Sequence, residues 1–220
     1  PESVSIEDRI SSILVRFPAA GHAEKFSLAA EIFELGEAGI EEICRRLSAP
    51  GIADDSLARY ALDAAGTHAM RPGGEKDRMV YTRAVIKALK VPADPEVKAF
   101  LAGRLERAGG PECLKPLSGL LSDRELVEPA VRALLAIRSP GTAKALLGAL
   151  GSSEASNTVA LLNALGDLRS REAVGRIVPF ASTRDPGVRE AALAALAALG
   201  DPRTEFLLSR VDVASSPRER

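Results

Sequence analysis

Residues 185–203 read Asp-Pro-Gly-Val-Arg-Glu-Ala-Ala-Leu-Ala-Ala-Leu-Ala-Ala-Leu-Gly-Asp-Pro-Arg, and this stretch decides the fold class. The opening Asp-Pro pair offers a side-chain acceptor at a helix N-cap and a ring with a preset φ angle at the first helical position. Apolar residues then follow Asp185 at offsets of 3, 7, 8, 11 and 14, which is one face of a helix with 3.6 residues per turn. The stretch therefore predicts an amphipathic helix that ends near Gly200, before a second Asp-Pro pair begins another.

The same pattern occurs three more times upstream, starting at Asp94, Asp123 and Glu154. Eleven residues after the four starts stand Leu105, Leu134, Leu165 and Leu196. We expect a shorter second helix after each first helix, over residues 111–121, 140–150, 171–181 and 202–211. Their shared apolar column is Leu117, Leu146, Ile177 and Leu208.

Helix boundaries follow from the residues between these segments. Besides Asp94-Pro95, Asp185-Pro186 and Asp201-Pro202, the pair Ser139-Pro140 predicts a helix start. Gly36, Gly109 and Gly200 stand where a first helix must reverse into a second, and glycine accepts the left-handed conformation common there.

The N-terminal part fits the pattern with departures. Residues 5–8 resemble a capping box that opens a helix to residue 17. Further helices are expected over residues 23–35 and 39–47, and over 54–70 and 77–89. Between the last two lie residues 71–76, a longer turn than the other repeats need.

Two helices in about 30 residues, stacked on similar neighbours, indicate a repeat architecture. We expect an all-α fold, an α-solenoid of about six helix pairs, with first helices outside and second helices inside a right-handed curved stack. Residues 1–213 should form this single domain, and residues 214–220 a polar tail or linker.

Two segments of the chain resemble known protein families. Residues 185–192 and 198–203 resemble the HEAT-like repeats associated with phycobilin lyases. Residues 5–47, with Arg-Phe-Pro-Ala-Ala and Ile-Cys-Arg-Arg-Leu, are similar to HEAT-repeat regions that precede carbohydrate-processing domains in bacterial envelope proteins. The second resemblance implies an exported accessory domain of a larger bacterial protein, so a periplasmic or envelope location is favoured over the cytoplasm.

Composition limits the function classes. The 29 basic residues nearly balance the 30 acidic ones, which argues against nucleic-acid binding through a global field. Aromatic residues are 4% of the chain and Trp is absent, so stacking platforms for bases or cofactors are lacking. No uncharged apolar run reaches the length of a membrane span. We expect no cofactor and no membrane insertion.

Few residues suggest chemistry. His22 and His68 are isolated from further metal ligands, and no phosphate-binding or nucleophile motif is present. Cys44 and Cys113 are too far apart in the repeat pattern for a disulfide and are expected to be buried thiols. We therefore predict no catalytic or metal site.

The leading hypothesis is a non-catalytic protein-interaction or scaffold module, monomeric, with a protein or peptide partner. Its contact candidates are Lys115, Lys144 and Arg176 on the second helices, with Arg71 and Lys76 of the 71–76 turn as edge contacts. One alternative is an enzyme of the HEAT-like DNA glycosylase or phycobilin-lyase type. Another is a structural subunit that assembles with itself.

Overall fold

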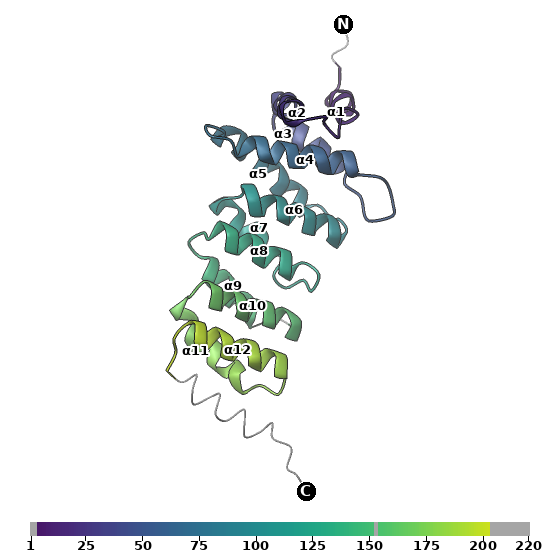
Figure 1. The fold of residues 1–220 in the computed structure, drawn as a ribbon. Coiled ribbons are helices and arrows are strands. Elements are labelled where there is room, and N and C mark those ends of the chain that lie inside the picture. The colour runs from purple at the N-terminus through teal and green to yellow at the C-terminus, as the bar shows by residue number, and fades with distance from the viewer. Residues whose placement is uncertain (1–3, 152–153, 203–220) are drawn as a thin grey trace. The chain divides into compact units, whose positions relative to one another are not determined.

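The computed structural model describes residues 4–151 and 154–202. Over these residues the chain folds into twelve α-helices and three short 3₁₀ helices, without a strand (Figure 1). This confirms the predicted all-α solenoid class. None of the described helices is both long and apolar enough to cross a membrane.

The chain divides into two compact units, Pro1–Leu117 and Ser118–Arg220. The helices of unit 1 are α1 (Ile6–Leu14), α2 (His22–Glu34), α3 (Gly36–Arg45), α4 (Ser56–Ala69), α5 (Glu75–Lys90), α6 (Pro95–Ala108), η1 (Pro111–Cys113) and α7 (Leu114–Ser118), whose last residue begins unit 2. The helices of unit 2 are α8 (Val127–Ile137), α9 (Thr142–Leu150), α10 (Ala155–Asp167), η2 (Arg171–Ala173), α11 (Val174–Ile177), η3 (Val178–Ser182) and α12 (Pro186–Ala198).

Within each unit, the first helices of successive pairs pack against one another. In unit 1, α2 packs against α4 and α4 against α6, and the second helices α3 and α5 pack together beside them. In unit 2 the first helices α8, α10 and α12 pack in the same order. A repeat of this kind buries its apolar face only against its neighbours, which is the principle of a solenoid.

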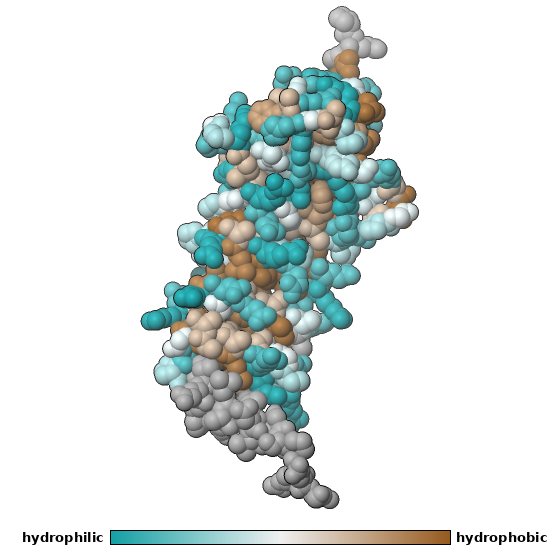
Figure 2. Space-filling model, in the orientation of Figure 1, coloured by the Kyte–Doolittle hydropathy of each residue, from teal (hydrophilic) through white to brown (hydrophobic). Residues whose placement is uncertain are grey.

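The leucine column predicted from the repeat lies at the centre of this packing. Leu105, Leu134, Leu165 and Leu196 are all fully buried. In the second helices Leu117, Leu146 and Ile177 are also fully buried, whereas Leu208 lies outside the described residues. Figure 2 shows the outward counterpart, a face covered largely by hydrophilic residues with separate hydrophobic patches.

The acidic caps behave as predicted at two repeat starts. Asp94 accepts a hydrogen bond from the backbone N–H of Glu96, and Asp185 accepts one from Val188. At the N-terminus Ser5 caps α1 by accepting from the N–H of Asp8, but the helix ends at Leu14 and not at residue 17. The helix that Asp201 is predicted to cap lies outside the described residues.

Two other predicted starts are wrong. Helix α9 begins at Thr142, two residues after Pro140, because Gly141 at φ +96° turns the chain before the helix. The Ser139 hydroxyl donates to the Pro140 carbonyl and caps nothing. Asp123 opens a turn by accepting from the N–H of Glu125, so α8 begins only at Val127.

The predicted left-handed residues are correct at Gly36 (φ +62°) and Gly200 (φ +66°) but wrong at Gly109, whose φ is −72°. In two repeats an arginine takes the left-handed position, Arg138 at φ 47° and Arg169 at φ 51°. The repeat geometry therefore imposes this conformation even where the sequence does not supply glycine.

The second helices are less regular than predicted in two repeats. Residues 111–118 and 171–182 combine α and 3₁₀ turns, and each segment contains an internal proline, Pro116 or Pro179. Proline has no N–H to donate, which disfavours a long regular helix there. The single domain over residues 1–213, its curvature and the tail over 214–220 stay predictions.

Candidate interaction surface

The three basic side chains predicted to contact a partner are all exposed. Lys115 lies on α7, Lys144 on α9 and Arg176 on α11, each in the second helix of its pair. Within unit 2 the Arg176 guanidinium lies beside the end of α9, because a β-carbon on Gly151 would be 3.5 Å from its Nη2 atom. Lys115 belongs to unit 1, so only Lys144 and Arg176 share one unit.

The two edge candidates differ from each other. Arg71 is engaged within the protein: its guanidinium is 2.7 Å from Asp77 and also donates to the carbonyl of His68 at 2.8 Å. Lys76 is exposed, but it lies in the first turn of α5 and not in a loop, because that helix begins at Glu75. The expected long turn is therefore only residues 70–74.

A longer connection, which the sequence reasoning did not single out, joins α3 to α4 over residues 46–55. It projects from unit 1 beside the start of α4 (Figure 1). Ile52 near its tip is 78% exposed, whereas the Ser48 hydroxyl donates to the carbonyl of Ala53 and closes the base. Pro50-Gly51 is the sequence signal that could have marked this turn.

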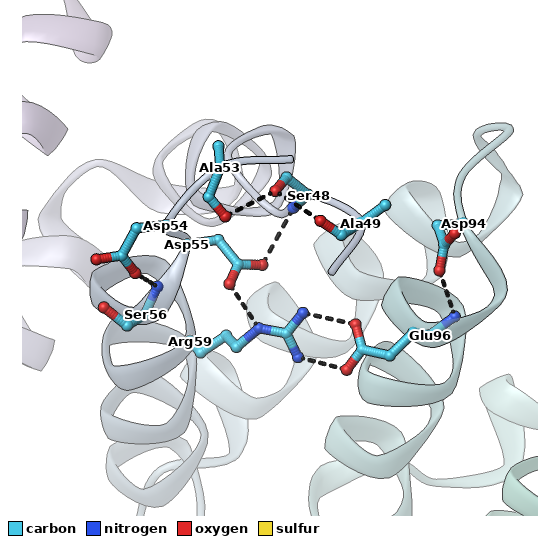
Figure 3. Close-up of polar contacts among 9 residues, drawn as sticks. All are labelled: Ser48, Ala49, Ala53, Asp54, Asp55, Ser56, Arg59, Asp94 and Glu96. Carbon is cyan, nitrogen blue, oxygen red and sulfur yellow. Dashed lines mark hydrogen bonds and ion pairs between the residues drawn. The ribbon is translucent and has the colours of Figure 1, made fainter. Parts of the chain in front are cut away.

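Arg59 on α4 connects the base of this loop to α6 (Figure 3). Its Nε donates to Asp55 at 2.9 Å, and its two Nη atoms donate to the two oxygens of Glu96 on α6 at 2.9 and 2.7 Å. Asp55 also accepts from the N–H of Ser48 at 3.1 Å. The hydrogen bond from Arg59, aided by its charge, holds the pKa of Asp55 below its usual range against the effect of burial.

Asp63 on α4 forms a second link between first helices. It accepts from Lys25 on α2 at 2.8 Å, and from Arg104 and Arg107 on α6 at 2.8 and 2.9 Å. Burial acts to raise the pKa of Asp63, but the hydrogen bonds and charges of Lys25 and Arg104 outweigh it and lower that pKa. The basic side chains of this layer thus stabilise the helix stack.

The second-helix face of unit 1 is arranged differently. Lys87 on α5 pairs with Glu37 and with Glu41 of α3, the latter at 2.8 Å, and Arg83 lies 3.5 Å from Glu37. At the end of α3, Arg45 pairs with Glu42. The arginine and lysine side chains are 56–64% exposed, whereas their acidic partners are only 11–29% exposed. On this face the cations therefore extend further into solvent than the carboxylates that pair with them.

A half-open pocket lies in the same face, between the ends of α3 and α5 and the start of α6. Its volume is about 260 Å³. Cys44, Leu47, Val91, Val97 and Leu101 supply much of its apolar lining, and Glu41, Arg45 and Lys87 stand among the lining residues as its charged members. No sequence pattern marks this pocket, because its walls come from three separate helices.

The remaining titratable candidates are structural. The ring of His68 is buried, with its centroid 4.3 Å from that of Phe26 and 5.4 Å from that of Phe33. Desolvation, followed by the charge of Arg71, lowers its pKa. Cys44 and Cys113 are both buried free thiols, as predicted, and burial raises their pKa values to about 12 and about 11. Among the described residues no three potential metal ligands meet.

Comparisons with known proteins support the repeat class. A family profile described as HEAT repeats matches residues 157–220, which supports HEAT-like repeats in this chain. No curated protein matches the chain significantly. Thirteen chains of solved structures match. One is the crystal structure of an engineered protein from a structural genomics consortium, with 18% identity, a TM-score of 0.41 and coverage of 87% of this chain and 96% of that one.

HEAT repeats commonly bind proteins, so the profile match is in keeping with an interaction or scaffold module. Stacked helical repeats offer extended surfaces whose exposed positions are free to vary while the core leucines are kept for packing.

Proposed function

We propose that this chain is a non-catalytic interaction module that binds an acidic protein segment through exposed basic side chains of its second helices. One observation carries the proposal. Lys115, Lys144 and Arg176 are exposed, and no carboxylate of the described residues lies within ion-pair distance of them. They contrast with the paired cations that link the first helices.

Physical chemistry favours an acidic segment as the partner. The chain has 29 basic and 30 acidic residues, so a partner is attracted by local charge and not by a net field. Exposed charge pairs are screened over about 8 Å at physiological salt, so affinity should fall as salt rises. Lys76 adds an edge contact of the same sign, and Arg71 would do so only by leaving Asp77.

The test is a selection from a phage-displayed library of random peptides, with the wild-type chain as the target. A triple variant with Lys115→Glu, Lys144→Glu and Arg176→Glu is the comparison. Its helicity and melting should stay nearly unchanged, because exposed substitutions usually shift stability by about 0.5 kcal/mol or less. We expect peptides rich in Asp and Glu that bind the wild type and lose most of their affinity for the triple variant.

Three results would count against the proposal. Selected peptides that bind the triple variant as well as the wild type would remove these residues from the site. Tight binding of duplex DNA with a steep salt dependence would favour the glycosylase-type alternative. A mass that rises with concentration in light scattering would favour the self-assembling subunit.

A further inference from the structure

The pocket between α3, α5 and α6 has no role in the helix packing described above. It lies wholly within unit 1 and opens to solvent, with Val91 on its rim 58% exposed. Its volume of about 260 Å³ is below the roughly 300–1,000 Å³ typical of pockets that enclose a small-molecule ligand. The dimensions suit one inserted side chain better than an enclosed cofactor.

The walls define the chemistry of that side chain. Leu47, Val97 and Leu101 are aliphatic, and the Cys44 thiol beside them stays protonated at neutral pH because burial raises its pKa to about 12. Among the described residues that line the pocket, the charged groups are Glu41, Arg45 and Lys87. An aliphatic or aromatic side chain would replace water at this surface and gain the burial free energy of apolar groups.

The rim defines the chemistry of the residues on either side. Lys87 and Arg45 are more than half exposed, and the carboxylates that pair with them lie deeper in the surface. Glu37 and Glu41 pair with Lys87, and Glu42 pairs with Arg45, yet both cations stay more than half exposed. A carboxylate approaching from solvent would therefore meet the cations before it meets Glu41 or Glu42.

We propose that this pocket is the anchor site for an acidic peptide segment that inserts one apolar side chain and places Asp or Glu residues against Arg45 and Lys87. The inference rests on the proposed function, because it names a docking point for the same class of partner. It places that point on the second helices α3 and α5, apart from Lys115, Lys144 and Arg176. Binding by one buried anchor within a charged rim is a common arrangement at protein interfaces.

The first test fills the pocket. Ala88 lines it, and Ala88→Trp introduces the chain's sole tryptophan, whose emission shifts to the blue if the indole lies in the pocket. Peptides selected on the wild type should bind this variant about tenfold more weakly or worse, since loss of an anchor costs at least that much. Ala136→Trp on the exposed face of α8 is the matched control and should bind normally.

A second pair of variants keeps the proposal testable if Ala88→Trp fails to fold. Val91 is exposed, so Val91→Ser leaves the core intact but removes apolar surface from the rim. Val15→Ser is its control, because it changes an exposed valine at the C-cap of α1, away from the pocket. Arg45→Glu should also weaken the same peptides, because it replaces a cation of the rim by a carboxylate. Glu42 keeps Arg46 as a partner in this variant, and Arg132→Glu on α8 is its control.

The outcomes separate the two proposals. Peptides with one apolar residue flanked by acids, bound by the controls and lost by the pocket variants, support the anchor. Peptides that lose affinity for the triple variant but bind all three pocket variants normally would overturn the anchor and leave the proposed function intact. Peptides of basic or wholly apolar sequence would overturn the charge argument, and the absence of any enriched peptide would overturn both.

Discussion

Leu165→Ala should be among the most damaging substitutions in unit 2. Leu165 is fully buried on α10, and this helix packs against both α8 and α12. The change removes three buried carbon groups, which at about 0.8 kcal/mol each is roughly 2.5 kcal/mol of lost transfer free energy. The residual cavity adds to this, so we expect a loss of about 3–4 kcal/mol, within the usual range for buried leucines.

Leu168→Ala is the control for this prediction, since Leu168 caps the same helix but is only half-buried. Truncation there removes carbons that already contact water and should cost less than half as much. Urea denaturation followed by far-UV circular dichroism measures both losses from the midpoint and slope. Equal losses for the two variants, or a loss below about 1 kcal/mol for Leu165→Ala, would refute the assignment of the leucine column to the core.

Two further predictions concern charge and backbone conformation. Asp63→Asn should lower the free energy of unfolding by about 1–2 kcal/mol at neutral pH, because each of its three partly exposed ion pairs contributes up to about 1 kcal/mol. Because the folded-state pKa of Asp63 is lowered, its contribution to stability is present above the unfolded pKa of about 3.9 and is lost as the pH falls through the folded value. A stability difference between wild type and variant that stays constant from pH 7 to acid would contradict this. Arg138→Gly should raise the melting temperature, because the left-handed conformation costs a side-chain-bearing residue about 1–2 kcal/mol. The added chain entropy of glycine in the unfolded state offsets only part of that gain. A lower melting temperature would show that the Arg138 side chain contributes more to stability than its backbone conformation costs.

The repeat made the core predictable. Leu105, Leu134 and Leu165 occupy one column because each helix must bury the same face, and the structure buries all three. Local turn chemistry was less reliable. Ser139-Pro140 has the composition of a helix start, but Gly141 takes a positive φ and moves the start to Thr142.

The long-range parts of the surface left no signal in the sequence. Asp63 meets Lys25 and Arg104 across 38 and 41 residues, and such pairing follows from how the helices stack. The pocket likewise needs Cys44 and Val97 to be brought together by the packing of α3, α5 and α6. By contrast, the exposure of Lys115, Lys144 and Arg176 follows from their offset from the buried column.

Hydrogen–deuterium exchange of the wild-type chain, with and without a selected acidic peptide, tests the central claim most directly. The account predicts that the peptide slows exchange in the second helices, at residues 44–47 and 88–93 beside the pocket and in α7, α9 and α11. The first helices α2 and α4, which do not line the pocket, should exchange at the same rate in both samples. Protection confined to those first helices, with no change in the second helices, would contradict the claim.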